Sequence, residues 1–421
     1  MVAVSRLIVR PSGPLQGEVT IGGAKNSALK LMAATLVAPG RHLLRNVPDI
    51  ADVHTMSELL EAIGCTVRRR EDDAIEIIRP EEVTPEAPAD LVARMRASTA
   101  VLGPLLASAG RVRLPLPGGD DFGARPVDMH LTALEELGVT HEVVDGVIEA
   151  RVDQLHGGEC KLDYPSVGAT ENILMAAVRA DGETTILNAA QEPEIWDLAA
   201  FLNRMGAHIL GAGSRTITVT GVGELRAVEH SVIPDRIEAA TYLAALGAAG
   251  GTITLRGADA GQLGVLIERL GSMGIRVAPE PGGLWATCEG RPRATDLQTL
   301  PYPGLATDHL PMLVAVLASA DGTSFATENV FTGRFGYVAE LARMGADISV
   351  EGHHLVVRGV DRLQGAEVRA LDIRAGAAMV VAGLGAEGET VVTDAHHVDR
   401  GYAGFVEQLC GLGADVRRAV G

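Results

Sequence analysis

Aromatic residues and positive charge are both scarce in this sequence. Only 3% of the 421 residues are aromatic, so the hydrophobic cores must be built mainly from aliphatic side chains. Acidic residues outnumber basic ones by 54 to 36, giving a formal net charge of -18. A field of that sign repels nucleic acids and anionic membranes, so we expect neither as a partner. Any cluster of cations is therefore a candidate site for an anionic ligand.

Cysteine and long apolar runs are equally sparse. The four cysteines have no metal-binding or redox spacing, which predicts buried, reduced thiols in a cytoplasmic protein: Cys65, Cys160, Cys288 and Cys410. No uninterrupted stretch reaches the roughly 18 apolar residues of a membrane span. The opening segment MVAVSRLIVRPSG holds a strand-like run that is too short for a signal peptide.

The sequence contains two histidine doublets, whose rings are possible metal ligands. His353-His354 and His396-His397 fall on predicted strands or turns. Adjacent residues on a strand face opposite sides, so neither doublet is expected to bind a metal through both rings. We therefore predict structural or solvated histidines, no metal site and no cofactor.

One phrase recurs six times: a helix-like stretch, a glycine near its end, and then a strand. The aligned glycines lie 68 to 74 residues apart: Gly64, Gly138, Gly206, Gly274, Gly345 and Gly413. A second phrase, a glycine followed by an alternating strand, recurs in step from Gly40, Gly110, Gly182, Gly251, Gly322 and Gly388. Each copy is predicted to hold a strand, a helix ended by glycine, a return strand, a further strand or hairpin, and a second helix.

The length of the repeat constrains how the copies assemble. A unit of this size is too small for a good core of its own, so the copies must pack on one another. Solenoid repeats usually run roughly 20–45 residues, which disfavours an open array. We therefore predict an α/β protein of two globular halves, three copies each, with a cleft between the halves as the default ligand site.

Three polar phrases depart from the repeat. In IGGAKNSALKL, glycines precede Lys25, Asn26 and Ser27 at a predicted helix start. This indicates either an anion site or a helix capped by Asn26 or Ser27 with a solvated lysine. The segment LPGGDDFGARPVDMH reads as a mobile loop that closes over a ligand, or as an ordinary surface turn. YPSVGATEN is a second phosphate cradle or another capped helix.

Four arginines stand in apolar surroundings, at comparable places in different copies. They are Arg96, Arg334, Arg374 and Arg400. Arginine seldom enters apolar runs without a partner, and its planar fork binds carboxylates and phosphates through two parallel bonds. Each arginine alone suits a structural ion pair, but four in phase point to one anion-binding cleft.

Eight phrases, in this order, resemble motifs of the enolpyruvyl transferase family along essentially the whole chain. They are GGAKNSALKL, MRAS, PGG-D-xxGARPVDMH, PSVGATEN, PDRIEAATY, TENVF-xx-RF, DIRAG and HVDRGY. Shikimate-pathway members open with Lys-Ser where this chain has Lys25-Asn26, so the resemblance is closer to members that act on UDP-N-acetylglucosamine. It implies an inside-out α/β barrel, or β-prism, of two domains, each with three βαβαββ-like units. The implied domains are residues 22–233, with the mobile Asp120 loop, and residues 1–21 with 234–421, with an interdomain active site.

The activity implied is transfer of the enolpyruvyl group of phosphoenolpyruvate to the 3-hydroxyl of UDP-N-acetylglucosamine, the first committed step of peptidoglycan synthesis. Two alternatives stay open. One is a paralogue that acts on another uridine nucleotide, such as UMP, in nucleoside-antibiotic pathways. The other is a non-catalytic regulator that binds a nucleotide sugar. The retained Lys25, Asp308, Arg374 and Arg400 argue against a pure binder, which has no use for the phosphoenolpyruvate cations.

The resemblance also implies roles for individual residues. Asp120 would be the general acid and Asp308 the base, with Lys25 and Arg400 as further catalytic groups. The implied phosphoenolpyruvate contacts are Lys25, Arg96, Arg125, Arg334, Arg374 and Arg400. The implied nucleotide-sugar contacts are Asn26, Arg125, Pro126, Val127, Asp128, Ser166, Val167, Gly168, Asp308 and Val330. Further polar cleft positions are Glu192, Asp235 and Asp372.

The chain departs from the family pattern at several of these motifs. Asp120 replaces the cysteine that many members carry and that the epoxide fosfomycin alkylates, which predicts intrinsic fosfomycin resistance. Ala100 stands where a bulky aromatic residue is frequent, ATDHLPM replaces the usual TD-x-Q, and Thr332-Gly333 replace an acidic residue and Asn or Ala. These changes fall on the acceptor side and keep the alternative acceptor open.

Overall fold

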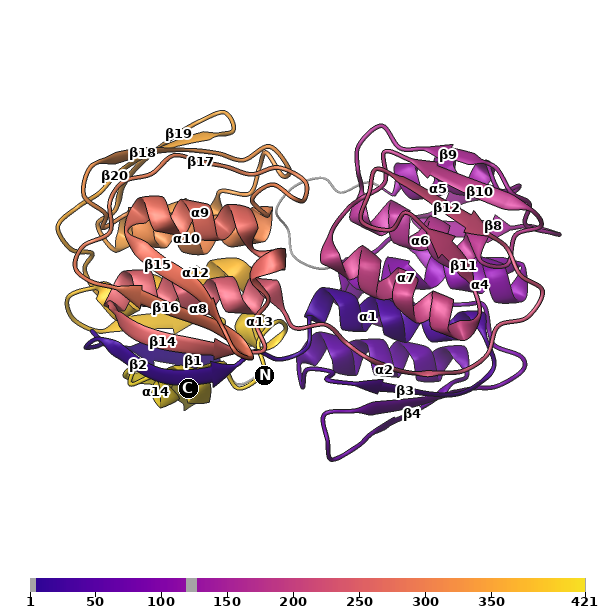
Figure 1. Ribbon diagram of the computed structural model, residues 1–421, viewed down its shortest axis with the longest axis horizontal. Coiled ribbons are helices and arrows are strands. Elements are labelled where there is room, and N and C mark those ends of the chain that lie inside the picture. Colours follow the sequence, from indigo (N-terminus) through magenta and orange to yellow (C-terminus); the bar gives the residue numbers. More distant parts are fainter. Residues whose placement is uncertain (1–4, 119–126, 421) are drawn as a thin grey trace. The chain divides into compact units, whose positions relative to one another are not determined.

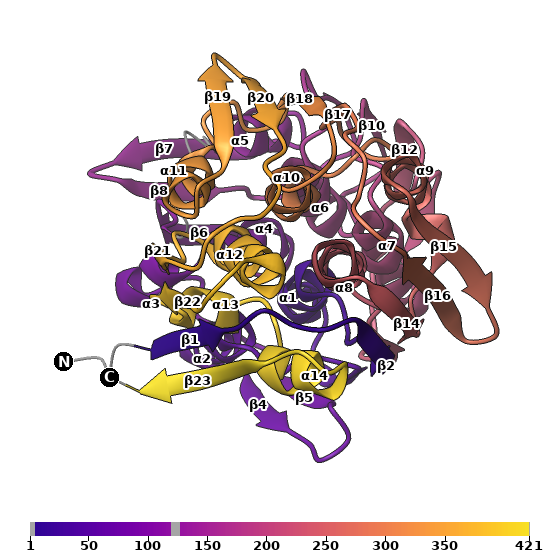
Figure 2. The ribbon, with the colours of Figure 1, turned by 90° about the vertical axis from the view of Figure 1, so that its left-hand side faces the viewer.

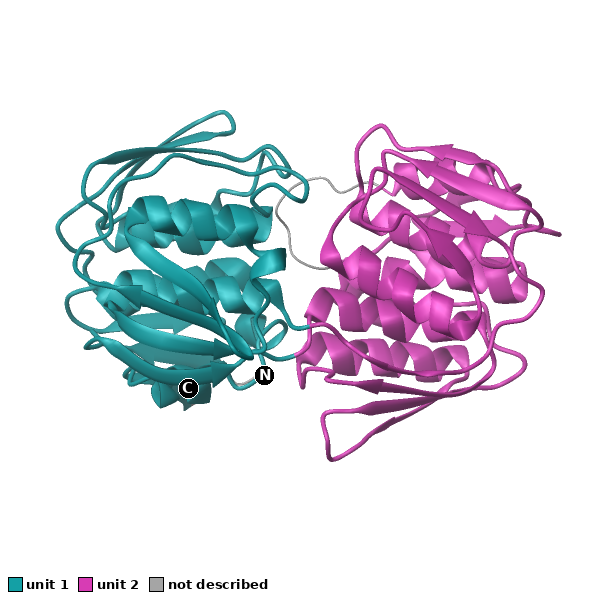
Figure 3. Cartoon of the chain, viewed as in Figure 1, with its two compact units in different colours: residues 1–22, 120–123, 234–421 teal, residues 23–119, 124–233 magenta. Residues whose placement is uncertain are grey.

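The computed structural model describes residues 5–118 and 127–420 (Figure 1). They form two compact units, coloured separately in Figure 3. Unit 1 holds residues 5–22 and 234–420, and unit 2 holds residues 23–118 and 127–233. The chain therefore begins in unit 1, enters unit 2 at residue 23 and returns at residue 234.

Unit 2 contains three sheets, each built around a strand that starts at or just after one of the repeated glycines. The central strands are β3 (Gly40–Arg45), β6 (Arg111–Pro115) and β10 (Glu183–Leu187). Each pairs with a hairpin, respectively β4–β5 (Thr66–Arg69, Ile75–Arg79), β7–β8 (Thr140–Val144, Val147–Arg151) and β11–β12 (His208–Leu210, Thr216–Thr220). On the edge away from its hairpin, β3 pairs in parallel with β13 (Glu229–Ser231), and β10 pairs in parallel with β9 (Glu159–Lys161). Among the described residues, the same edge of β6 has a single parallel bridge, between Glu86 and Arg113.

Unit 1 repeats this arrangement three more times. Its central strands are β14 (Gly251–Arg256), β18 (Thr323–Thr327) and β22 (Thr390–Thr393). The first two pair with hairpins β15–β16 (Ile275–Glu280, Gly283–Cys288) and β19–β20 (Asp347–Glu351, His354–Arg358). The parallel partners are β2 (Leu15–Thr20), β17 (Leu297–Gln298) and β21 (Glu367–Arg369). The six sheets match the six copies predicted from the glycines.

The sixth sheet is completed by the N-terminal segment rather than by a local hairpin. β1 (Ser5–Val9) lies antiparallel between β22 and β23 (Val416–Val420), as Figure 2 shows. The chain's two ends therefore share one sheet, and β1 takes the place that a hairpin strand holds in the other five copies.

The repeated glycines have the backbone conformation that the pattern predicts. All six glycines that follow the outer helices have φ between 85° and 113°. A Cβ disfavours this left-handed region, whereas glycine enters it freely and lets the chain leave the helix. The prediction that glycine ends the helix in every copy is confirmed.

Each unit holds three buried central helices. They are α8 (Arg236–Ala249), α10 (Leu310–Leu317) and α12 (Ile373–Gly385) in unit 1, and α1 (Lys25–Ala34), α4 (Leu102–Ala109) and α6 (Val167–Ala177) in unit 2. Outer helices leave one face exposed: α2 (Ala51–Ile63), α5 (Asp128–Glu135), α7 (Pro193–Met205), α9 (Gly264–Met273), α11 (Gly336–Arg343) and α14 (Phe405–Gly411). The buried core is overwhelmingly Leu, Val, Ile, Ala and Met, as the low aromatic content predicts.

Short helices complete the fold. They are α3 (Ala89–Arg94), α13 (His396–Asp399) and the 3₁₀ turns η1 (Thr35–Val37), η2 (Arg96–Val101), η3 (Ala260–Gln262) and η4 (Thr307–His309). Turn η2 runs directly into α4, and η4 runs directly into α10. No helix in the described part of the chain is long and apolar enough to cross a membrane.

The histidine doublets differ from the sequence prediction. His396 and His397 lie in helix α13, not on a strand or turn, and their ring centroids are 4.3 Å apart. The rings of His353 and His354 are 4.0 Å apart, because the first lies in the turn before β20. The expectation that each doublet faces opposite sides was therefore wrong. Among residues 5–118 and 127–420, no group of three His, Cys, Asp or Glu residues is arranged to hold a metal ion.

The prediction that the cysteines are buried is confirmed at three positions and wrong at one. Cys65, Cys160 and Cys288 are buried free thiols, and burial raises the pKa of Cys65 to about 11. Cys410 is exposed, because it lies on the outward side of the short outer helix α14.

Candidate functional site

The candidate residues gather at the starts of the six central helices. Lys25 is the first residue of α1, and Arg96 opens the turn that leads into α4. Ser166, Asp235 and Asp372 are the N-cap residues of α6, α8 and α12, and Asp308 lies in the turn before α10. Helix N-termini favour anions, because their first amides are unpaired and the dipole is positive there. The repeat therefore places the candidates at equivalent points of the six copies.

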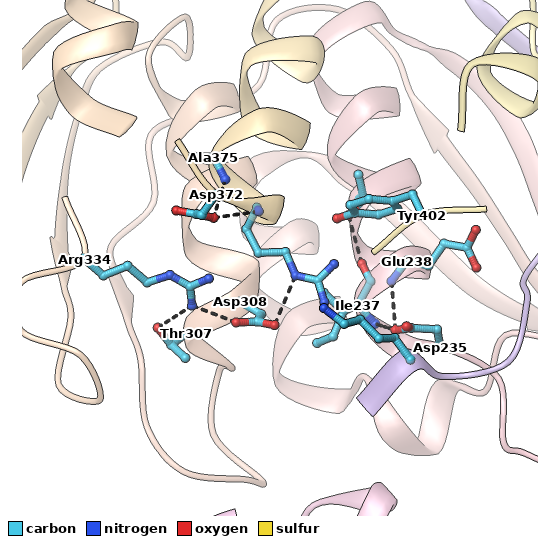
Figure 4. Close-up of polar contacts among 12 residues, drawn as sticks. Asp235, Ile237, Glu238, Thr307, Asp308, Arg334, Asp372, Ala375 and Tyr402 are labelled. Carbon is cyan, nitrogen blue, oxygen red and sulfur yellow. Dashed lines mark hydrogen bonds and ion pairs between the residues drawn. The ribbon is translucent and has the colours of Figure 1, made fainter. Parts of the chain in front are cut away.

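In unit 1, Asp308 joins two of the candidate arginines (Figure 4). Its Oδ1 accepts a 2.7 Å hydrogen bond from Nη1 of Arg334, and its Oδ2 accepts a 3.1 Å bond from Nε of Arg374. Both arginine side chains are 4% exposed, whereas the Asp308 side chain is 24% exposed. The two guanidinium groups therefore hold a carboxylate at the rim of the unit's interior.

These contacts set the charge state of the cluster. Burial alone would raise the pKa of Asp308, but the charges of Arg334 and Arg374 outweigh it and hold that pKa well below the usual aspartate range. Burial opposes the charged form of Arg374, yet Tyr402 and Asp308 raise its pKa. The carboxylate is thus fully ionised at neutral pH. It is a weak base while both arginines are bound to it.

Two caps hold the neighbouring helix starts. Oδ1 of Asp372 accepts bonds from the amides of Arg374 and Ala375, and Oδ1 of Asp235 accepts from the amides of Ile237 and Glu238. Both aspartates are used as structural caps. Because both also lie beside Arg374, they add polar groups to the surroundings of the Asp308, Arg334 and Arg374 cluster.

Glu238 and Tyr402 lie close to Arg374. The guanidinium carbon of Arg374 lies 5.2 Å from the centroid of the Tyr402 ring, whose hydroxyl is 2.8 Å from Oγ1 of Thr241. Glu238 accepts a 2.9 Å bond from the amide of Gly22. Burial, and then the neighbouring Asp235, raise the pKa of Glu238 to about 8. A neutral carboxylic acid therefore lies among the charged groups at neutral pH.

A buried glutamate holds the segment that carries Val330 and Arg334. Oε1 of Glu328 accepts bonds from the amides of Val330 and Phe331, and Oε2 accepts a 2.7 Å bond from the Thr307 hydroxyl. The same Thr307 oxygen accepts a 3.2 Å bond from Arg334. Glu328 thereby ties this segment to the turn that carries Asp308.

Two other unit 1 positions complete the candidate set. Arg400 follows α13 and is partly exposed. His309, part of the departure from the family motif, is 3% exposed, and burial together with Arg236 lowers its pKa to about 3. Within the described residues, neither ring nitrogen of His309 has a hydrogen-bond partner.

In unit 2, Lys25 is buried and paired. Its ammonium lies 2.8 Å from Oδ2 of Asp52 on α2, and the two side chains are 9% and 5% exposed. The solvated lysine of the alternative interpretation is therefore wrong. The predicted cap by Asn26 or Ser27 is also wrong, since the N-cap is Ala24 without any side-chain bond. A Cβ on Gly23 would lie 1.6 Å from the carbonyl oxygen of Asn46, so this glycine serves close backbone packing.

A second buried ion pair and an amide network surround the start of α6. Lys30 lies 2.6 Å from Oε2 of Glu171. Asn172 accepts a 2.7 Å bond from the amide of Gly103, and its amide nitrogen is 3.0 Å from Nδ1 of His130. Burial lowers the pKa of His130 to about 4, and the nearby charges of Arg96 and Lys30 act in the same direction.

The remaining nucleotide-sugar candidates have mixed surroundings. The Ser166 hydroxyl caps α6 by accepting a 3.3 Å bond from the amide of Ala169, and Val167 and Gly168 follow it as partly exposed residues. Glu192 is the partly exposed N-cap residue of α7. Asp128 begins α5 and is exposed, whereas Val127 is buried. Asp120, Arg125 and Pro126 lie outside the described residues.

Several buried polar residues beside the candidates were not predicted. Less than 4% of the residue surface is exposed for Asp52, Glu171 and Glu328, and 6% for Glu238. Glu171, Glu238 and Glu328 stand inside three of the quoted motifs, PSVGATEN, PDRIEAATY and TENVF. Asp52 belongs to none of the quoted motifs. Nothing in the sequence marked it as buried, because an aspartate in the first turn of an outer helix is usually solvated.

The chain resembles known proteins over nearly its full length. The profile of the EPSP synthase (3-phosphoshikimate 1-carboxyvinyltransferase) family matches residues 9–409. The UDP-N-acetylglucosamine 1-carboxyvinyltransferase of Corynebacterium jeikeium is 50% identical over 404 residues, which cover 96% of both chains. That of Mycolicibacterium paratuberculosis is 49% identical over 98% of this chain and 99% of the relative.

Solved structures give the same fold. The enolpyruvyl transferase NikO from Streptomyces tendae superposes with a TM-score of 0.90 at 28% identity, covering 100% of both chains. An EPSP synthase from Acinetobacter baumannii gives a TM-score of 0.77 at 18% identity, over 99% of this chain and 100% of that one, which is evidence for the fold alone.

Proposed function

The chain belongs to the EPSP synthase family of enolpyruvyl (carboxyvinyl) transferases, and from this premise we propose that it acts on phosphoenolpyruvate and UDP-N-acetylglucosamine. The enolpyruvyl group moves to the 3-hydroxyl of the sugar. The C2–O bond to phosphate breaks, a C2–O bond to the sugar forms, and inorganic phosphate leaves. The observation that carries this proposal is the 50% identity, across 96% of both chains, to a UDP-N-acetylglucosamine 1-carboxyvinyltransferase.

We also propose a metabolic role, a cellular compartment and a fold for the two domains. Enolpyruvyl transfer to this sugar nucleotide is the first committed step of peptidoglycan synthesis, and we place it in the cytoplasm. No redox cofactor is needed, because no electrons are exchanged. The fold proposed for both halves is the inside-out barrel, with residues 22–233 and residues 1–21 with 234–421 as the three-unit domains.

The phosphoenolpyruvate contacts are proposed from charge and geometry. This ligand carries a phosphate and a carboxylate, so several cations must surround it. Arg334 and Arg374 already bind one carboxylate, that of Asp308, through separate nitrogens. The proposed set is Lys25, Arg96, Arg125, Arg334, Arg374 and Arg400.

The proton transfers are assigned to two aspartates. Asp120 donates a proton to C3 of phosphoenolpyruvate, which makes C2 electrophilic, and Asp308 accepts the proton of the attacking hydroxyl. Loss of phosphate and of a C3 proton from the tetrahedral adduct then restores the double bond. When the ligand's anionic groups draw Arg334 and Arg374 toward themselves, Asp308 becomes a stronger base.

The acceptor contacts are proposed for the polar helix starts and their flanks. They comprise Asn26, Arg125, Pro126, Val127, Asp128, Ser166, Val167, Gly168, Asp308 and Val330. Glu192, Asp235 and Asp372 serve as further polar positions of the site, the last two as caps that hold Arg374 and Glu238 in place.

The departures in the acceptor motifs support a second candidate for the acceptor. Ala100 and His309 are buried, and Thr332 and Gly333 are exposed, next to residues of the proposed site. These positions leave another uridine nucleotide, such as UMP, as the second candidate.

Phosphate release from phosphoenolpyruvate, measured with UDP-N-acetylglucosamine and with UMP in separate reactions, tests the proposal. We expect turnover with the sugar nucleotide. Turnover with UMP alone would replace the acceptor, and no turnover with either would favour the non-catalytic regulator. A Lys25→Ala variant with full activity would overturn the site assignment.

A further inference from the structure

The helix that carries Lys25 and Asn26 starts without a local cap. Its N-cap residue, Ala24, offers no side-chain oxygen, whereas Ser166, Asp235 and Asp372 cap α6, α8 and α12 with their own side chains. An uncapped first turn frays more easily, because its leading amides lack intrahelical partners. Something outside the helix must therefore fix the two candidate residues.

A buried carboxylate from another helix provides that anchor. Asp197 of α7 accepts a 2.5 Å hydrogen bond on Oδ2 from the hydroxyl of Ser27, in the first turn of α1. Its Oδ1 lies 2.7 Å from Nε2 of His230 at the end of unit 2. Ser27 is fully buried and Asp197 is 4% exposed, so solvent does not compete for these bonds.

The same carboxylate also holds the segment where the chain leaves unit 2. Oδ2 of Asp197 accepts a 3.2 Å bond from the amide of Ile233, and the carbonyl of Ile233 accepts a 2.7 Å bond from the amide of Ala24. Asn46 adds a 2.9 Å bond to the carbonyl of Val232. The entry and exit segments of unit 2 are thus joined to each other, and Asp197 ties both to α7.

We propose that Asp197 is a positioning residue for the Lys25–Asn26 start of α1, acting through the Ser27 hydroxyl and the Ile233 amide. The proposal rests on the function proposed above, because it assigns Asp197 an effect on the binding of phosphoenolpyruvate. Asp197 itself touches neither substrate. It does for α1 what local caps do for α6, α8 and α12.

Kinetic measurement of Ser27→Ala, Asp197→Asn and the double variant tests the proposal. We expect each single variant to raise the KM for phosphoenolpyruvate by roughly ten-fold, the loss typical of a buried hydrogen bond to a charged group. The double variant is expected to match Asp197→Asn, since Ser27→Ala removes one of the bonds that the Asp197 carboxylate makes. Full additivity, or an unchanged KM, would overturn the proposal.

A control variant at the other end of the same helix separates positioning from general destabilisation. The Thr35 hydroxyl is fully buried and donates a 2.7 Å bond to the carbonyl of Met32. Thr35→Val removes a comparable bond without touching the start of α1. It is expected to lower the Tm and to leave the KM unchanged. If Ser27→Ala lowers the Tm but also leaves the KM unchanged, the role of Asp197 is structural only.

A readout independent of turnover distinguishes this proposal from the proposed function. The chain has three lysines, Lys25, Lys30 and Lys161, so amine acetylation can be followed at each by peptide mass spectrometry. Exposed Lys161 serves as the internal reference. We expect faster labelling of Lys25 relative to Lys161 in Ser27→Ala and Asp197→Asn, but not in Thr35→Val. An unchanged ratio refutes the positioning role, whereas an inactive wild type refutes the proposed function alone.

Discussion

The ammonium of Lys25 lies 2.8 Å from the carboxylate of Asp52, and both side chains are almost fully buried. The lysine proposed to bind phosphoenolpyruvate is thus already neutralised by a residue of its own unit. Arg334 and Arg374 share the single carboxylate of Asp308, which compensates part of their charge. An anionic ligand must compete with these internal carboxylates. They keep buried cations tolerable in its absence.

Replacing Asp52 by Asn tests this internal competition. Leaving a buried ammonium without its carboxylate is expected to cost about 3 kcal/mol of stability. Phosphoenolpyruvate then meets a cation that has lost the Asp52 carboxylate, so its addition should raise the Tm more in the variant than in the wild type. Thermal unfolding with and without the ligand measures both effects.

Glu58→Gln on the same helix is the matched control. Glu58 forms an exposed 2.6 Å pair with Arg94, and such pairs contribute about 0–1 kcal/mol. Its variant should unfold near the wild-type temperature and show the wild-type response to phosphoenolpyruvate. A ligand response of Asp52→Asn that is smaller than that of the wild type would contradict the competition.

The architecture was predictable because backbone geometry recurs in the sequence. A helix end in the left-handed region needs glycine, so six helix ends leave six glycines in phase, and Gly64 and Gly345 could be read directly. Strand β1 in the sixth sheet could be placed only by resemblance, since nothing in residues 5–9 names its partner strands.

The partners of the candidate side chains were much less predictable. Asp52 and Asp197 are the same residue type as the many exposed aspartates of this chain, and their burial is not visible in the sequence. The cap of α1 was expected from Asn26 or Ser27, yet Ser27 turns its hydroxyl to Asp197 on another helix. Tertiary contacts overrode a correct local propensity at that position.

The depressed pKa of Asp308 predicts a pH-dependent stability difference. The folded-state pKa lies below that of the unfolded chain, so the contribution is complete above the unfolded value of about 3.9 and is lost as pH falls below it. Asp308→Asn should therefore be less stable than the wild type at pH 7. The difference in Tm should shrink between pH 5 and pH 3.

Asp361→Asn provides the comparison for Asp308→Asn. Asp361 is 99% exposed and pairs with Arg291 at 3.0 Å, so its loss should change the Tm little at any pH. A Tm difference for Asp308→Asn that stays constant down to pH 3 would show that the two arginines do not hold the carboxylate in its charged form.

Glu238 predicts the opposite trend with pH. Its pKa is raised to about 8 in the folded chain, so its contribution is complete below the unfolded value near 4.3 and is lost as pH rises toward 8. Glu238→Gln imitates the neutral acid and keeps an acceptor for the Gly22 amide. The variant should gain stability relative to the wild type between pH 5 and pH 8. A Tm difference independent of pH in that range would contradict the raised pKa.

His309 predicts a stabilising substitution. Its imidazole is buried and neutral, and neither nitrogen has a partner within the described residues, an arrangement that costs about 1–3 kcal/mol. His309→Leu should therefore raise the Tm. His42 is the control, because its equally buried ring is 3.0 Å from the carbonyl of Ala38, and His42→Leu should lower the Tm. Parallel losses in both variants would show that His309 has a partner after all.

Fosfomycin sensitivity should depend on residue 120 alone. The epoxide alkylates a thiolate, and the sequence offers the carboxylate of Asp120 at that position, a far weaker nucleophile toward an epoxide. We expect the wild type to retain activity after incubation with fosfomycin and the Asp120→Cys variant to lose it over time. Intact-mass and peptide analysis should then find one adduct, on residue 120 of the variant. The exposed Cys410 serves as the internal control, because a generally thiol-reactive epoxide would label it in both proteins. An adduct on Asp120 of the wild type would refute the prediction.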